Sequence, residues 1–197
     1  MSDIIADRAK FERGWSGGLP ETPCGYGSKM STTELQREWI PEVITRYGIE
    51  TICDVGAGDL NWLQHMDLRG AHYLGLDLVP RHERVNRFDL LEEQPPQSDL
   101  ILCLWVLNHL PYAASELALS NLLTSGSKYL MMTDRPKWHA EQPPLIAELA
   151  KHSIESIIVE RVKRDAIHLI DIVAAVAAAA GDVGEEVVFT DRKRKRK

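Results

Sequence analysis

The chain has 197 residues, of which 44% are hydrophobic and 26% charged, and its formal net charge is −6. This composition excludes a fibrous or wholly disordered protein, and the length favours one domain with a single large core. The N-terminus lacks a secretory signal, and the most apolar run, IVAAVAAAA at 172–180, is too short to span a bilayer, so we expect a cytoplasmic protein.

Predicted helices and strands alternate along the chain. A short helix at 3–13 precedes a loop rich in glycine and proline, which either covers a ligand or serves as an irregular linker. Ser31 and Glu34 form a capping pattern that predicts a helix over about 32–47, kinked or split at Pro41 and ended by Gly48.

Five apolar strands are predicted next, at 50–55, 72–79, 84–90, 99–106 and 128–134. A short helix is expected after the first strand, and longer helices at 110–126 and 143–153. A sixth strand at 154–162, a helix from 166 that Gly181 stops and a closing strand at 185–191 complete the prediction, and a strand within 165–180 stays open as the alternative to that helix.

The predicted strands contain few polar residues, which is typical of strands buried on both faces. Alternation of such strands with helices predicts an α/β fold, a Rossmann-like, doubly wound and mostly parallel sheet. We expect residues 1–191 to form a single domain in which residues 1–31 supply the N-terminal helix and loop.

The last six residues, 192–197, are all basic, and without them the chain has 17 basic and 29 acidic residues. Most of the surface should therefore repel a nucleic-acid backbone. We interpret the tail either as a solvated, disordered terminus or as a binding element for nucleic acid or another acidic partner.

The stretch DVGAGDLNW, residues 54–62, places Gly56 and Gly58 in the turn after the first predicted strand. Ligands of doubly wound sheets bind beyond such turns, where glycine lets the backbone approach them closely. A dinucleotide site would continue to a third glycine, but Asn61 stands at that position. Asp54 and Asp59 flank the turn, and their carboxylates disfavour a pyrophosphate but suit a cationic ligand.

Two further acids follow predicted strands. Asp77 lies nineteen positions after Gly58, at the end of the second strand, where a carboxylate can accept hydrogen bonds from both hydroxyls of an adenosine ribose. Asp89 ends the third strand, within reach of an adenine amino group. Taken singly, each acid could instead be a helix cap or a turn residue.

With these residues in place, the chain resembles the class I S-adenosylmethionine-dependent methyltransferases. The likeness is carried by DVGAGDLNW, YLGLDLV (73–79), RFDLL (87–91) and DLILCLWVLNHL (99–110). More closely, the chain resembles small methyltransferase-like proteins of bacteria and their viruses, on the stretches GGLPETPCGYGS (17–28), DVGAGDLNW, DLILC (99–103), NHL (108–110) and SGSKYLMMT (125–133).

The resemblance implies a seven-stranded sheet whose last strand is antiparallel, with S-adenosylmethionine as the cofactor. It implies that Gly56 and Gly58 face the methionine part, that Asp77 holds the ribose and that Asp89 with Leu90 borders the adenine. The candidates for cofactor contacts are Asp54, Gly56, Gly58, Asp59, Trp62, Asp77, Leu78, Asp89, Leu90, Cys103 and Leu104.

Methyl transfer depends largely on holding donor and acceptor at the right distance, so a base is needed only if the acceptor must lose a proton. His109, after the fourth strand, is the candidate base, with a structural or substrate-positioning role as the alternative. Trp62 and Trp105 could contact a sulfonium cation through their rings or simply pack in the core. Trp105, Asn108 and Asp134 are the candidates for substrate contacts.

Several other chemistries lack their motifs. The histidines and cysteines show no metal-ligand spacing, and the chain has no GxSxG elbow and no P-loop. The motif of enzymes that methylate exocyclic amines of DNA is missing after the fourth strand. Pro23-Cys24 resembles the nucleophile dipeptide of cytosine-carbon methyltransferases but lies in a loop before the turn, so we do not assign it that role.

The acceptor stays open among a small molecule, a sugar, a protein side chain and RNA. A rival hypothesis from another class is a non-catalytic protein that binds S-adenosylmethionine and regulates or scaffolds a partner through the basic tail. A dinucleotide-binding dehydrogenase is the weakest alternative because the third glycine is missing.

Overall fold

The computed structural model describes residues 20–134, 158–162, 167–173 and 190–191. The predicted helices at 3–13 and 143–153 and the basic tail lie outside these residues. Eight strands form one sheet in the order β3-β2-β1-β4-β5-β7-β6-β8.

The first five strands are confirmed and pair in parallel throughout. Their bounds are β1 (Thr51–Val55), β2 (His72–Asp77), β3 (Val85–Arg87), β4 (Leu100–Cys103) and β5 (Tyr129–Thr133). The chain passes from β1 to β2 on one side, whereas β4 continues to β5 on the other, so the strand order reverses between β1 and β4. In doubly wound sheets, ligands bind at this switch point, beyond the carboxyl ends of the strands.

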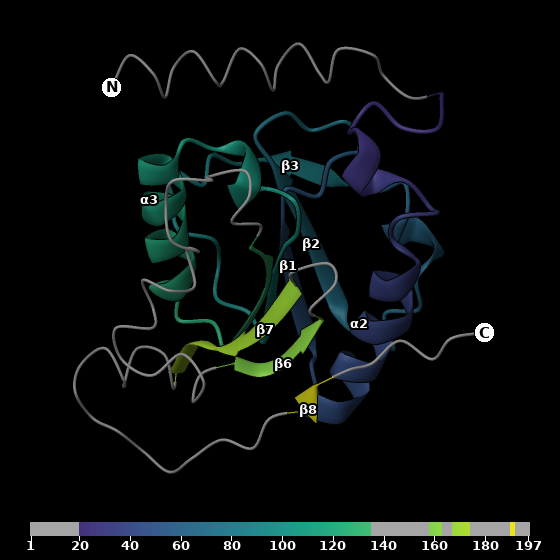
Figure 1. Cartoon of the computed structure of the whole chain (residues 1–197), viewed down its shortest axis with the longest axis vertical. Helices are drawn as coiled ribbons and strands as arrows, with labels where there is room; N and C mark the ends of the chain where they lie inside the picture. Colours follow the sequence, from purple (N-terminus) through teal and green to yellow (C-terminus); the bar gives the residue numbers. More distant parts are fainter. Residues whose placement is uncertain (1–19, 135–157, 163–166, 174–189, 192–197) are drawn as a thin grey trace.

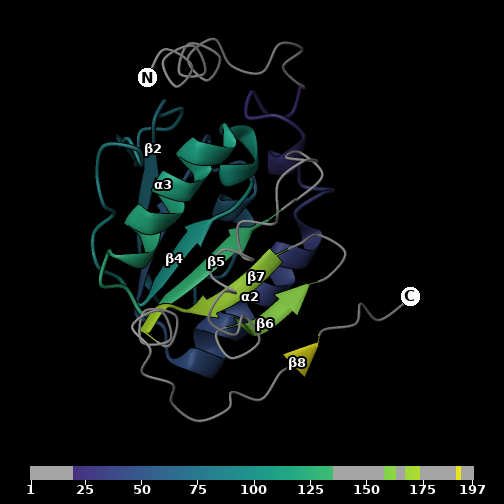
Figure 2. The same ribbon diagram turned by 60° about the vertical axis from the view of Figure 1, so that its left-hand side comes forward.

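The remaining strands are β6 (Ile158–Val162), β7 (Ile167–Asp171) and β8 (Thr190–Asp191). Strand β7 is antiparallel to both β5 and β6, and in Figure 2 its arrowhead points away from the end to which β4 and β5 point. The Rossmann-like, mostly parallel fold is thus confirmed.

At this end of the chain the structure decides what the sequence left open. Residues 167–171 form the antiparallel strand β7 rather than a helix, and Thr190–Asp191 pair in parallel with β6. The alanine run after 172 favoured a helix in isolation, but Ile167, Leu169 and Ile170 are fully buried in the cores on the two faces of the sheet, and such tertiary burial outweighs local helix propensity.

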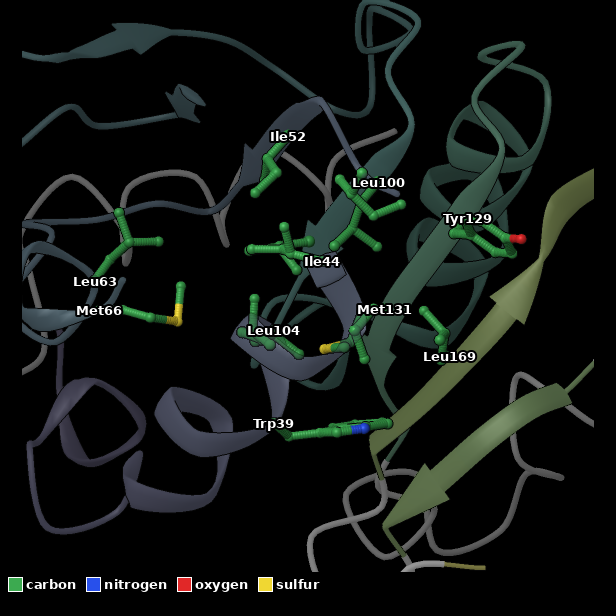
Figure 3. Packing of buried hydrophobic residues seen from close by; sticks show 14 of the residues in the cluster. Trp39, Ile44, Ile52, Leu63, Met66, Leu100, Leu104, Tyr129, Met131 and Leu169 are labelled. Carbon is green, nitrogen blue, oxygen red and sulfur yellow. The ribbon is translucent and has the colours of Figure 1, made fainter. Parts of the chain in front are cut away.

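Helices α2 (Glu34–Tyr47) and α3 (Tyr112–Leu123) cover opposite faces of the sheet, as Figure 1 shows. Strand β4 serves both cores because its side chains alternate: Leu100 and Leu102 belong to the cluster with α2, whereas Ile101 belongs to the cluster with α3. Figure 3 shows the α2 cluster, in which Trp39 lies near Leu104 and Met131. The two cores hold the carboxyl ends of the strands at one edge of the sheet.

Helix α2 is close to its predicted bounds, and its end at Gly48, which adopts the left-handed conformation (φ 59°), is confirmed. Pro41 lies inside the helix without splitting it. The capping pattern is wrong: Thr33 is the N-cap residue, and its hydroxyl donates to the Lys29 carbonyl (2.8 Å).

Three single-turn 3-10 helices lie in the connections: η1 (Tyr26–Ser28), η2 (Leu63–His65) and η3 (Leu107–His109). The short helix expected after the first strand is thus the single turn η2. Within the described part of the chain, none of the helices has the length and apolar character needed to cross a membrane.

Candidate functional site

The glycine turn after β1 wraps around the end of β2. The amides of Gly56 and Ala57 both donate to the Leu76 carbonyl (2.8 and 3.0 Å), and the Gly58 amide donates to the Asp77 carboxylate (2.8 Å). Gly56 and Gly58 have φ of 91° and 59°, a left-handed region that side chains disfavour. The turn thereby brings the two glycines close to Asp77, which is far from them in sequence, at the switch point of the sheet.

Asp77 lies at the end of β2 as predicted, and both its oxygens accept backbone hydrogen bonds. Oδ2 accepts from Gly58 and Oδ1 from the Val79 amide (2.9 Å). Burial raises the pKa of Asp77, although these two bonds and the charge of Arg81 oppose the increase. Each carboxylate oxygen has two acceptor positions, so one position on each remains for ligand hydroxyls.

Asp54, in β1, is only 5% exposed and accepts a hydrogen bond from the Tyr73 hydroxyl (2.7 Å). Gly75 stands opposite Asp54 in β2, and a β-carbon there would lie 3.2 Å from the Tyr73 ring and hydroxyl. Glycine at this position therefore makes room for Tyr73 to reach Asp54. Burial raises the pKa of Asp54 to about 7; the bond from Tyr73 opposes this increase and the charge of Asp77 adds to it.

Asp89 lies two residues beyond the end of β3, and the neighbouring Phe88 amide donates to the Asp77 carbonyl (2.9 Å), which ties the chain before Asp89 to the end of β2. The Asp89 carboxylate accepts from the Leu91 amide (3.0 Å), as a turn residue does. Leu90 is buried in the α3 cluster and Leu78 is half-buried. Their contacts with an adenine stay a prediction.

Asp59 and Trp62, which follow the glycines of the turn, both contact other parts of the protein. Asp59 accepts from the Thr22 hydroxyl (2.6 Å) and from the Asn61 amide (3.2 Å). Trp62 is half-buried and packs against the α2 cluster. Roles for Asp59 and Trp62 toward a cofactor stay predictions beside these structural ones.

The chain after β4 closes the other side of the switch point. Cys103 has no exposed surface and Leu104 is buried, both within the core clusters. Trp105 adopts φ of 63°, which is rare for a bulky residue, and its amide donates to the Thr133 hydroxyl at the end of β5 (3.3 Å). Backbone outliers of this kind concentrate at ligand sites, which favours a functional role for this turn.

The remaining candidates also follow β4 and β5. Asn108 and Asp134 are each 5% exposed, and the Asn108 amide nitrogen lies 3.2 Å from His109 Nε2. His109 is half-buried at the end of η3, a few residues after Trp105. If Nε2 accepts this bond, it cannot accept a proton from a substrate at the same time, so catalysis by His109 stays a prediction.

The cysteines behave as core or packing residues, and all three are free. Burial, with a contribution from Asp59, raises the pKa of Cys24 to about 12. Its thiol therefore stays protonated near neutral pH and is a poor nucleophile, which argues against a catalytic role for Cys24.

Sequence reasoning missed Tyr73, Thr22 and Asn61 as parts of this site. The Tyr73 side chain could have been found, because it lies on the same face of the sheet as Asp54 and beside a glycine. Thr22 gave no local signal, since its partner is 37 residues away. Among the described residues, no group of three or more His, Cys, Asp or Glu side chains could hold a metal ion. A groove beside α2, lined in part by Glu38 and Asp67, contains none of the predicted site residues.

Asp54→Asn should raise stability at alkaline pH. The pKa of the Asp54 carboxyl rises from 3.8 to about 7 on folding. The contribution of this group to the free energy of unfolding is therefore fully present below pH 3.8 and is lost as pH rises through 7. Between pH 5 and 9 this group should lower the wild-type free energy of unfolding by roughly 2–3 kcal/mol, and the variant should lack that fall. Urea titrations across this range measure it; parallel pH profiles for the two proteins would contradict the assignment.

Comparison with known proteins identifies the fold. No protein-family model matches the chain. A ubiquinone biosynthesis O-methyltransferase of Leptothrix cholodnii is 28% identical over 118 residues, covering 50% of each protein. The protein of the same name from Nitrosomonas europaea is 29% identical over 110 residues, covering 47% of each. The chain spans about half the length of the curated relatives it matches.

Among solved structures, the N-methyltransferase NodS of Bradyrhizobium japonicum WM9 in complex with S-adenosyl-L-homocysteine superposes with a TM-score of 0.50 at 12% identity. The match covers 71% of this chain and 85% of that one. With its parallel strands, its antiparallel β7 and these similarities, the chain has the fold of the class I S-adenosylmethionine-dependent methyltransferases, and about half of it is similar in sequence to proteins named as O-methyltransferases.

Proposed function

We propose that this chain binds S-adenosylmethionine at the switch point between β1 and β4 and transfers its methyl group to an unidentified acceptor. The observation that carries the proposal is the placement of Asp77, whose carboxylate is held at the end of β2 by the Gly58 and Val79 amides. The sequence relatives are named as O-methyltransferases, which supports the reaction class.

The residues at the switch point fit a cationic adenosyl ligand. Asp77 offers one acceptor position on each oxygen toward ribose hydroxyls, and Asp89 lies beside it toward the adenine end. Asp54 and Asp77 are both carboxyl groups in a poorly hydrated environment, where a nearby positive charge would lower their raised pKa values. A cation is thus favoured here, and a pyrophosphate is not.

When bound, S-adenosylmethionine supplies a methyl carbon activated by its sulfonium sulfur. The chain's own contribution is mainly positional: the glycine turn and Asp77 fix the donor, and the turn with Trp105, Asn108 and His109 after β4 borders the place of the acceptor. In favourable cases such positioning accounts for about 7–11 kcal/mol of a barrier. His109 would act as a base only with an acceptor that must lose a proton, and only after releasing Asn108.

The position of the acids at the sheet edge also gives the simplest test of binding. Calorimetric titration with S-adenosylhomocysteine should show binding that Asp77→Ala abolishes and that Asp77→Asn weakens by roughly ten- to a hundredfold, since a hydrogen bond to a charged group contributes about 1.5–3 kcal/mol. Asp67→Ala, an exposed acid paired with Arg69, is the control and should bind normally. Binding of NAD in place of the adenosyl ligand would show that the proposal is wrong.

The rival function is a non-catalytic S-adenosylmethionine-binding regulator or scaffold. The engagement of His109 Nε2 by Asn108 favours it, because the structure holds the candidate base in a protein contact. Incubation with a radiolabelled methyl donor and fractionated extract separates the two: the enzyme should label one fraction, and the Asp77→Ala variant should label none. Repeated failure of the wild-type protein across proteins, nucleic acids and metabolites would instead support the regulator.

We further propose that the basic tail, residues 192–197, gives the chain its affinity for nucleic acid or another acidic partner. The support is electrostatic: the tail residues are all basic and attract an acidic partner, whereas the rest of the chain is strongly acidic and repels one. Removal of these six residues should lower any affinity for nucleic acid and reduce its salt dependence, measured by fluorescence anisotropy at several salt concentrations. Equal binding and equal salt slopes with and without the tail would exclude this role.

A cytoplasmic location is part of the same proposal. The three free cysteines are consistent with a reducing compartment. Fractionation of the cells that make this protein tests it directly: recovery with the cytosolic marker enzymes is expected, and recovery from an extracytoplasmic fraction would contradict it.

A further inference from the structure

The segment Glu21–Met30, called the covering segment below, spans the switch point. Within it, Cys24 lies against Gly58, where an added β-carbon would lie 2.8 Å from the Cys24 sulfur. Three residues later Gly27 lies against Trp105, where a β-carbon added to Gly27 would lie 2.9 Å from Cγ of the ring. Gly58 follows β1 and Trp105 follows β4, so the covering segment bridges the two strands between which the order reverses.

Polar contacts fasten the covering segment to the glycine turn. Thr22 is 1% exposed and donates to the Asp59 carboxylate (2.6 Å). The side-chain nitrogen of Asn61 donates both to Glu21 Oε1 (3.0 Å) and to the Ser28 carbonyl (2.9 Å). Glu21 Oε1 also accepts from the amide of Met30, so the two ends of the segment meet at one carboxylate (2.6 Å).

The role of Asn61 explains a departure seen in the sequence. Asn61 stands where a dinucleotide-binding turn would have its third glycine, a residue without a side chain to hold anything. In this chain the same position supplies two side-chain hydrogen bonds to the covering segment. At the position where dinucleotide sites need a glycine, this turn therefore carries an anchoring side chain.

We propose that the covering segment forms one wall of the ligand site, and that Thr22 and Asn61 are positioning residues that hold this wall in place. A ligand at the switch point must enter between the turn after β1 and the turn after β4, and the covering segment contacts both. Figure 2 shows the start of the described chain, in purple, at the end of the sheet toward which β4 and β5 point. The identity of the ligand, an adenosyl sulfonium compound or its demethylated product, rests on the proposed function.

The contacts carry a thermodynamic consequence. If the docked segment is part of the ligand site, docking of the segment raises the affinity for the ligand, and bound ligand raises the equilibrium constant for docking by the same factor. Thr22 and Asn61 then influence affinity without touching the ligand, through the fraction of molecules in which the segment is docked. If the segment lay on the surface outside the ligand site, the ligand would not change its docking, and Thr22 and Asn61 would not influence affinity.

The test combines hydrogen exchange with calorimetry on the full chain, with S-adenosylhomocysteine as the probe. In the wild-type protein the ligand should slow amide exchange at least fivefold across residues 21–30, where the amides of Cys24, Ser28 and Lys29 are hydrogen-bonded. Thr22→Val, which loses the hydroxyl but keeps the shape, should speed exchange there and weaken ligand binding about tenfold. Thr22→Ser restores the hydroxyl and should bind within twofold of wild type.

Asn61→Ala should act like Thr22→Val because it removes the two side-chain hydrogen bonds from Asn61 to Glu21 and to the Ser28 carbonyl. The matched controls are Thr45→Val on the exposed face of α2, and Gln94→Ala, whose carboxamide pairs with Thr124 just beyond α3. Both controls lose a polar contact away from the switch point and should leave affinity unchanged. Thermal melting of every variant checks that the fold is intact.

The outcomes separate this inference from the proposed function. If wild-type protein does not bind S-adenosylhomocysteine, the proposed function fails. If it binds but exchange across residues 21–30 does not slow, or folded Thr22→Val binds as tightly as Thr22→Ser, the proposed function stands and the covering segment is not part of the site. Should a variant fail to fold, exchange in the wild-type protein with and without ligand still decides the question.

Discussion

The architecture at the switch point depends on one hydrogen bond, from the Gly58 amide to the Asp77 carboxylate. It joins the turn after β1 to the end of β2, and it requires Gly58 to adopt a left-handed conformation that side chains disfavour. The adjacent amides of Gly56 and Ala57 support it by donating to the Leu76 carbonyl. Because the turn is fixed to β2, the acids of β1, β2 and the β3 connection are held together at a single edge of the sheet.

The part of the fold that could be predicted is the part encoded locally. Continuous apolar runs predicted β1, β4 and β5 because these strands are buried along nearly their whole length, and the glycine at position 48 predicted the end of α2 because glycine readily adopts the left-handed conformation found there. The placement of Asp77 at a strand end followed from the same reasoning. Strand β7 escaped prediction because its pairing with β5, and not its own alanine-rich surroundings, decides its conformation.

The features of the site that escaped prediction are all long-range. Asp54 could be named from the sequence, but its partner Tyr73 depends on the register of β1 and β2 and on the space left by Gly75. Asn61 was visible only as the absence of a glycine, although its amide binds residues more than thirty positions earlier. Spacing along the chain can locate the acids of such a site, but it cannot show what covers them.

The central claim is that the edge of the sheet around Asp77 receives an adenosyl ligand through its ribose. A crystal structure of the chain with S-adenosylhomocysteine tests this most directly. The account predicts the ribose hydroxyls at about 2.6–3.2 Å from the Asp77 oxygens, with the ligand between the glycine turn and the turn after β4. A ligand bound elsewhere, or an Asp77 carboxylate turned away from the ribose, would contradict it.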